Sequence, residues 1–218
     1  MNKFIYRLGL WLGFLFLSLN SYAERNLEKL IDNHQSQFED IALKIWDYAE
    51  VGYQEYKSSD LLKRKLSEEG FAIKSNIANI PTAFVAEYGE GLPVIAILGE
   101  FDALPGVAQS SSPFRESYKD NAAGHACGHH LFGAGSAWAS VAIKEWLIAN
   151  NQKGTVRFYG TPAEEGGSGK VYMAREGIFN DVDVMLHWHP GSASHASPRT
   201  SNSNKSAKFS FKGISAHA

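Results

Sequence analysis

The chain has 218 residues, with 21 Lys and Arg against 23 Asp and Glu and a formal net charge of −2 at pH 7. Its basic residues are scattered, so nothing resembles the electrostatic footprint of a nucleic-acid-binding protein, and we expect no nucleic-acid partner. Eight histidines and a single cysteine stand out. One cysteine forms no intrachain disulfide, so Cys127 is free, bridges a dimer or binds a metal.

The first 23 residues are typical of a secretory signal peptide. Lys3 and Arg7 precede the apolar run LGLWLGFLFLSL, and the segment SYA at 21–23 fits a small-x-small cleavage site. The apolar run is short for a membrane span, although a retained anchor is the alternative. We therefore expect a secreted or periplasmic protein without a stable membrane span after signal removal.

Two amphipathic helices are expected next. Apolar residues recur at steps of three and four over 27–49, and a second helix is predicted from about Ser59 to Glu69, closed by Gly70. Three strand signals follow, FAIKS, TAFVAEY and PVIAILGE. The last contains a continuous apolar run that suits a strand buried on both faces.

The second half of the chain alternates helices and strands. HLFGAGSAWASVAIKEWLIANN predicts a long helix, TVRFYG a strand, GKVYMAREG a short helix and VDVMLHWH another strand. This order implies crossover connections, and hence an α/β fold with a mainly parallel sheet and flanking helices. The polar stretch 191–206 then separates this alternating pattern from a last strand-like run, AKFSFKG. It indicates a domain junction.

Candidate ligands follow several of these strands. Glu100 and Asp102 come after PVIAIL, Glu164 and Glu165 after TVRFYG, and His189 ends VDVMLHWH. Ligands of open α/β sheets collect beyond the carboxyl ends of the strands, so we expect these side chains at one edge. The adjacent glutamates suit a division of labour in which one binds metal and the other takes a proton from water. A solvated acidic turn, or an anion-binding nest at GGSG, is the alternative.

The stretch AGHACGHHLFGAG places Cys127 and His129 at the entrance of the long helix, where a loop can aim both at one point. Thiolate, imidazole and carboxylate are the ligands expected of zinc and its neighbours, whereas the pair alone also fits a buried thiol beside a helix cap. His187 and His189 point to the same side of their strand, so one could be a ligand and the other a supporting or core residue. His34 is interpreted as a surface or packing residue.

Five motifs carry a family resemblance. In order, GEFDALPG, GHACGHHLFGAG, RFYGTPAEEGGSGK, LHWHPG and FKGISAHA resemble the dinuclear metal amidohydrolases that include aminoacylase, hippuricase and the auxin-conjugate hydrolases. The resemblance implies two divalent metal ions, zinc or manganese, and hydrolysis of the amide bond of an N-acyl or N-aroyl amino acid. It also implies that 24–205 is the N-terminal part of the catalytic domain. Residues 206–218 would begin an α+β lid and dimerisation domain, truncated here, of a protein that forms homodimers or hetero-oligomers.

By matched motif, the resemblance implies metal ligands at Cys127, His129, Glu165 and His189. His189 is preferred because its offset from Asp183 matches the family's spacing, whereas counting back from Pro190 would favour His187.

The resemblance assigns three further roles. Glu164 is the general base, Asp102 orients a ligand from behind, and His217 reaches the substrate oxyanion from the lid, where it can act across a dimer. His130 stands where many relatives carry Asp. The family takes a last metal-ligating histidine from a later segment, so we expect a truncated chain that is by itself a poor catalyst. A catalytically inactive fragment, or a metal-binding protein of the same lineage, is the alternative.

Overall fold

The computed structural model describes residues 28–116 and 122–196, together with positions 200, 202–203, 205, 207–214 and 217 of the C-terminal tail. The predicted signal peptide, residues 1–23, lies outside the described residues. Within the part of the chain that is described, no helix has both the length and the apolar character needed to cross a membrane.

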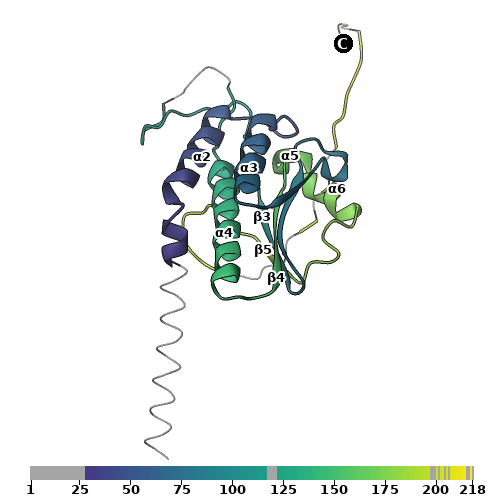
Figure 1. Ribbon diagram of the computed structural model, residues 1–218. Helices are drawn as coiled ribbons and strands as arrows, with labels where there is room; N and C mark the ends of the chain where they lie inside the picture. The colour runs from purple at the N-terminus through teal and green to yellow at the C-terminus, as the bar shows by residue number, and fades with distance from the viewer. Residues whose placement is uncertain are drawn as a thin grey trace, which may run out of the picture.

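A five-stranded sheet with the order β1-β2-β4-β3-β5 forms the centre of the molecule (Figure 1). Its strands are β1 (Ala72–Ser75), β2 (Phe84–Glu90), β3 (Val94–Gly99), β4 (Gly154–Gly160) and β5 (Val184–Leu186). Strand β3 pairs in parallel with β4 and β5, whereas β1 with β2 and β2 with β4 pair antiparallel. The predicted α/β class is confirmed; the sheet is mixed, and β2 is the strand that runs antiparallel to its neighbours.

The two antiparallel pairings have a simple cause. The connection 76–83 between β1 and β2 is shorter than the dozen or more residues that a parallel crossover requires. A tight turn at 91–93 reverses the chain between β2 and β3. In the sheet, β4 lies between β2 and β3 and is parallel to β3. Strand β4 therefore runs antiparallel to β2, while the three strands that lead to the candidate ligands stay parallel.

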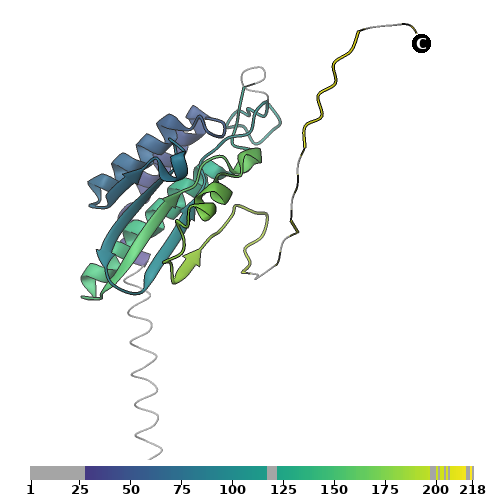
Figure 2. The ribbon, with the colours of Figure 1, turned by 90° about the vertical axis from the view of Figure 1, so that its right-hand side faces the viewer.

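Helices cover both faces of the sheet (Figures 1 and 2). Their bounds are α2 (Gln35–Tyr48), α3 (Tyr56–Glu68), α4 (His129–Ala149), α5 (Glu164–Gly167) and α6 (Gly169–Arg175), with a short 3-10 helix at Ile77–Asn79. Helices α2, α3 and α4 share one core with Ile97, and Met173 of α6 shares the other with Leu98. Strand β3 is thus buried on both faces, as its apolar run predicts.

Several predicted boundaries differ from the structure. The strand expected for VDVMLHWH is observed only as β5, Val184–Leu186, so His187 and His189 lie beyond its end and not on one side of a strand. The helix expected over 27–49 is interrupted by a turn at 33–34, and α3 begins at Tyr56, before the expected Ser59. The strand expected for AKFSFKG is wrong: residues 207–214 are exposed and irregular, and no described strand pairs with them. Figure 2 shows this tail running away from the domain. The domain division at 205 and 206 stays a prediction.

Candidate metal centre

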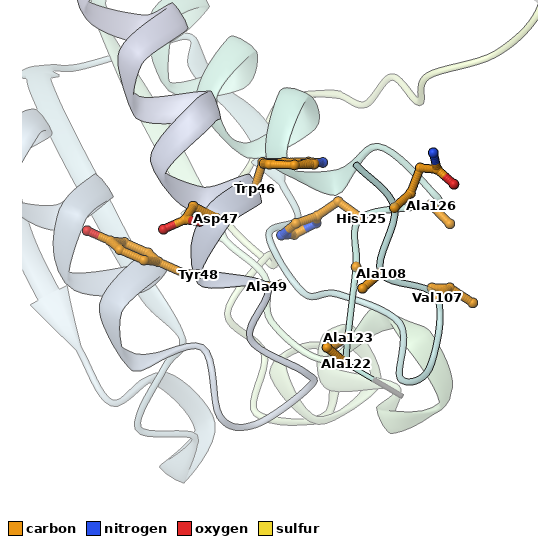
Figure 3. Close-up of a pocket in the computed structure, with 12 residues that line it drawn as sticks. Trp46, Asp47, Tyr48, Ala49, Val107, Ala108, Ala122, Ala123, His125 and Ala126 are labelled. Atoms are coloured by element: carbon orange, nitrogen blue, oxygen red, sulfur yellow. The ribbon is translucent and has the colours of Figure 1, made fainter. Parts of the chain in front are cut away.

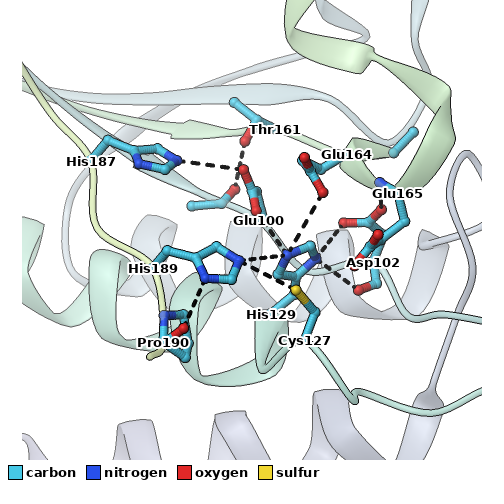
Figure 4. A network of polar contacts seen from close by, with 12 residues as sticks. Glu100, Asp102, Cys127, His129, Thr161, Glu164, Glu165, His187, His189 and Pro190 are labelled. Atoms are coloured by element: carbon cyan, nitrogen blue, oxygen red, sulfur yellow. Dashed lines mark hydrogen bonds and ion pairs between the residues drawn. The ribbon is translucent and has the colours of Figure 1, made fainter. Parts of the chain in front are cut away.

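The predicted ligands converge beyond the carboxyl ends of the parallel strands (Figure 4). Strand β3 leads into Glu100 and Asp102, β4 into the turn with Glu164 and Glu165, and β5 into the segment 187–189. Helix α4 begins at the same place. Parallel strands end at one edge, so segments far apart in the sequence deliver their polar side chains to a single point.

His129, the first residue of α4, is the centre of this cluster and is fully buried. Its Nδ1 lies 2.9 Å from Oδ1 of Asp102, and its Nε2 lies 2.9 Å from Oε2 of Glu100. Burial lowers the pKa of the imidazole, but the hydrogen bonds to Asp102 and Glu100 outweigh it and raise the pKa to about 10. The surrounding carboxylates therefore strongly favour a positive charge at this position.

Cys127 and His189 face His129 across a small gap. Nε2 of His189 lies 3.4 Å from Sγ of Cys127 and 3.4 Å from Nε2 of His129. The other nitrogen of His189 lies 2.9 Å from the carbonyl oxygen of Pro190, while Asp102 holds the other nitrogen of His129. Both imidazoles are thus oriented from behind, with their Nε2 atoms and the thiol directed at one point.

The surroundings of Cys127 disfavour the thiolate form of its side chain in the absence of a cation. Its pKa is raised to about 11 by burial, by a hydrogen bond with Glu165, and by the negative charges of Glu165, Glu164 and Glu100. Thiolates bind metals and thiols do not, so a divalent ion among these groups would reverse the local field and favour the thiolate.

The adjacent glutamates have different surroundings. The backbone N–H of Glu165 donates to Oδ2 of Asp102 at 2.8 Å, and its buried Oε1 has no hydrogen-bond partner among the described residues. Glu164 is 46% exposed, and its Oε2 lies 4.0 Å from Nε2 of His129. Burial and the charges of Glu100 and Glu165 raise the pKa of Glu164. Glu165 thus has a buried carboxylate oxygen, whereas Glu164 is open to solvent.

These donors fit a divalent metal ion. Among the described residues, the ligand atoms of Cys127, His129 and His189 lie within 4.8 Å of one another, as do those of Glu100, His129 and Glu164. The buried, unpartnered oxygen of Glu165 is an atom that costs free energy unless a cation or hydrogen-bond donor satisfies it. Sulfur, nitrogen and oxygen donors of this kind bind zinc and neighbouring transition metals.

Two further charged residues lie near the cluster: Glu100, a candidate ligand in the sequence, and Lys170. Glu100 is buried and forms an ion pair with Lys170 of α6, and its Oε1 lies 3.5 Å from Nε2 of His187. Burial raises the pKa of Glu100, but contacts with His129, His187 and Lys170 outweigh it and lower the pKa well below its usual range. The position of Glu100 after β3 was visible in the sequence. Nothing in the sequence pointed to Lys170.

The other predicted histidines lie elsewhere. His187 faces Glu100 rather than Cys127, so the geometry favours His189 as the ligand from the segment after β5, and this choice stays a prediction. His217 is exposed in the tail and is not brought to the cluster. The His130 ring lies 5.1 Å from that of His125, and burial and the charge of His129 lower the His130 pKa to about 4.

A cavity and a second cluster of potential metal ligands lie outside this centre. A cavity of about 520 Å³ lies between the end of α2 and the loop that contains His125 (Figure 3), and the described residues that line it include none of the predicted ligands. The ligand atoms of His34, Glu69 and Glu145 lie within 4.8 Å of one another. However, Lys65 and Lys144 both bind Glu69, so this group is a salt-bridge network already balanced by cations.

An α/β sheet whose carboxyl edge gathers cysteine, histidine and paired glutamates is typical of metallopeptidases and related metallohydrolases. The chain belongs to peptidase family M20/M25/M40, whose sequence profile matches residues 96–205.

Comparison with individual proteins agrees with this family. The chain is 44% identical to a subunit of the p-aminobenzoyl-glutamate hydrolase of Escherichia coli K12, covering 89% of this chain and 40% of that protein. It is 31% identical to the hippurate hydrolase of Campylobacter jejuni, covering 75% and 42%. The chain thus spans about two fifths of the length of these curated relatives.

Solved structures share the fold. The Bacillus subtilis YXEP protein, described as a dinuclear metal binding peptidase from the M20 family, matches with a TM-score of 0.59 and 29% identity, over 73% of this chain and 44% of that chain. An aminobenzoyl-glutamate utilization protein from Klebsiella pneumoniae matches with a TM-score of 0.54 and 15% identity, over 76% and 46%.

Proposed function

We propose that this chain supplies the metal centre and general base of an amidohydrolase that cleaves N-acyl or N-aroyl amino acids. The observation that carries the proposal is the pairing of Glu165, which has a buried carboxylate oxygen, with the open Glu164, beside a cluster of sulfur and nitrogen donors. A site that only stores metal has no need of the second carboxylate. Relatives named for p-aminobenzoyl-glutamate and hippurate support the substrate class.

The metal centre is proposed to hold two divalent ions, zinc or manganese. A dinuclear relative of known structure and the cluster of Cys127, His129 and His189 support this assignment. The residues that would hold the ions are Cys127, His129, Glu165 and His189, with Asp102 fixing the orientation of the His129 ring. Bound divalent ions supply Lewis-acid activation of water and polarise the scissile carbonyl.

Glu164 is proposed to move the proton. Its carboxylate accepts a proton from the attacking water, whose oxygen bonds to the scissile carbonyl carbon. The C–N bond then breaks, and Glu164 returns the proton to the leaving amine, so that an acid and an amino acid are released. The geometry supports this role, because the exposed carboxylate of Glu164 lies beside the cluster, with Oε2 4.0 Å from Nε2 of His129, and does not share the buried position of a ligand.

The test is metal binding together with turnover. The purified chain is stripped with a chelator, reloaded with Zn²⁺ or Mn²⁺, and assayed on p-aminobenzoyl-glutamate, hippurate and an N-acetyl amino acid, with Glu164→Gln as the matched control. We expect chelator-sensitive hydrolysis that the control lacks, at a slow rate because His217 is exposed in the tail and has no contact with the centre among the described residues. Metal binding with no turnover on any substrate would support the alternative of a non-catalytic metal-binding protein.

Export and assembly are part of the same proposal. We propose that residues 1–23 direct the chain to a secreted or periplasmic location and are then removed, which mass spectrometry of the exported protein would check.

We also propose assembly into a homodimer or hetero-oligomer, since one relative is itself named as a subunit. A monomer by light scattering, alone and with metal, would contradict the assembly.

A further inference from the structure

The segment 51–55, which joins α2 to α3, lies directly against the turn that presents Glu164 and Glu165. A Cβ atom added to Gly52 would lie only 3.0 Å from Cα of Ala163 and 3.1 Å from its Cβ. A side chain at this position would be crowded against Ala163, so glycine allows the two segments to approach this closely. Neither segment is near the other in the sequence, and the contact is created by the fold.

Glu55 holds the start of the turn. Its side chain is fully buried, and Oε1 accepts a hydrogen bond from the backbone N–H of Ala163 at 2.8 Å. Its Oε2 accepts another from the hydroxyl of Thr82 at 3.0 Å. Ala163 has φ 56° and ψ 44°, a left-handed conformation that residues with a side chain rarely adopt. The buried carboxylate thus anchors the strained residue that directly precedes Glu164.

Tyr53 holds the end of the same turn. Its hydroxyl donates a hydrogen bond to the carbonyl oxygen of Gly167 at 2.6 Å. A Cβ atom on Gly167 would lie 2.7 Å from Cβ of Ala163 and 2.9 Å from the Tyr53 ring, so the turn is closed tightly on itself and on this ring. The anchors at Ala163 and Gly167 enclose Glu164 and Glu165 on both sides.

We propose that Glu55 and Tyr53 are positioning residues that keep Glu165 directed at the metal ligands and Glu164 open toward the substrate. The inference rests on the proposed function of this site. Asp102 restrains only the middle of the turn, through the N–H of Glu165, so the direction of the two carboxylates depends on how the ends are held. Burial raises the pKa of Glu55 to about 7, in keeping with a group placed here for its contacts despite the cost of burying it.

The test compares three variants with the unmodified chain. Tyr53→Phe removes one hydroxyl, Glu55→Leu removes both acceptors at similar volume, and Glu55→Gln keeps an acceptor for Ala163. Tyr56→Phe, an exposed tyrosine at the start of α3, is the matched control. Circular dichroism and thermal melting establish that each variant is folded. Titration with Co²⁺ reports affinity, and the visible and thiolate-to-cobalt bands report the geometry of the centre.

We expect Tyr53→Phe and Glu55→Leu to bind Co²⁺ about tenfold more weakly with altered visible bands, since groups that orient ligands typically change metal affinity by about 10 to 100 times. Glu55→Gln and Tyr56→Phe should resemble the unmodified chain. If Glu55→Leu does not fold, the Co²⁺ affinity and spectrum of Tyr53→Phe decide whether the positioning role holds. Unchanged affinity and spectrum in Tyr53→Phe would overturn the positioning role while leaving the proposed function intact. If the unmodified chain binds no Co²⁺, the proposed function fails, and the inference with it.

Discussion

Replacing Glu55 by glutamine should remove a large pH dependence from the stability of this chain. Burial raises the pKa of the Glu55 carboxyl from 4.5 to about 7 in the folded protein. Glutamine has the same shape and no titration near neutrality, and its amide oxygen can still accept the N–H of Ala163. The substitution therefore isolates the cost of ionising this buried group.

The sign and size follow from proton linkage. Below pH 4.5 both the folded and the unfolded chain keep the proton on Glu55, so its full contribution to stability is present. Between 4.5 and about 7 only the unfolded chain releases the proton, and the free energy of unfolding falls. A tenfold change in proton affinity corresponds to about 1.4 kcal/mol, so the complete loss over the shift from 4.5 to about 7 is about 3.5 kcal/mol. About 2.5 kcal/mol of it falls between pH 5 and pH 8.5.

Urea denaturation at a series of pH values measures this quantity. Other groups also titrate, including His129, whose raised pKa gives stability that is present at low pH and lost as the pH rises through about 10. The difference between the curves of the unmodified chain and Glu55→Gln therefore isolates Glu55, with the exposed Glu68→Gln on α3 as control. We expect Glu55→Gln to gain relative stability as the pH rises. Parallel curves for the two proteins would refute the reasoning.

Four further predictions concern the metal centre. Glu164→Gln should keep its metal, measured by elemental analysis, and lose turnover by roughly a thousandfold or more, because the proton acceptor is removed and no ligand is; near-normal rates would show that another group is the base. His189→Ala should lose metal and His187→Ala retain it, and loss in His187→Ala alone would contradict our choice of ligand. Cys127→Ser should bind Zn²⁺ more weakly in competition with a chelator and lose the thiolate-to-cobalt band, whereas an unchanged band would exclude the thiolate as a ligand. Asp102→Asn should weaken metal affinity by about 10 to 100 times by calorimetry; full affinity would show that the ring of His129 is held by other contacts.

Local patterns in the sequence were sufficient to predict most elements that carry the centre. The apolar run of β3 and the long helical pattern of α4 are set by the spacing of apolar residues, which depends on neighbours in the chain. The carboxyl ends of parallel strands meet at one edge, so Glu164 and Glu165 could be grouped with Cys127 and His129 before the fold was known. The run AKFSFKG has the same local pattern as a strand, yet a strand forms only where another can pair with it.

Only the tertiary structure decided how the donors meet. The insertion of β4 between β2 and β3 determined which strand ends lie next to one another at the edge of the sheet. His187 and His189 are told apart by their contacts, since His187 faces Glu100 and His189 faces Cys127. Glu55 could not be connected with Ala163 from the sequence, because a buried carboxylate in a helix-flanking segment has no distinguishing pattern. The sequence by itself thus determined the chemical identity and chain order of the predicted ligands, which are covalent properties. Their mutual distances, orientations and proton affinities depend on long-range packing and burial, which exist only once the chain has folded.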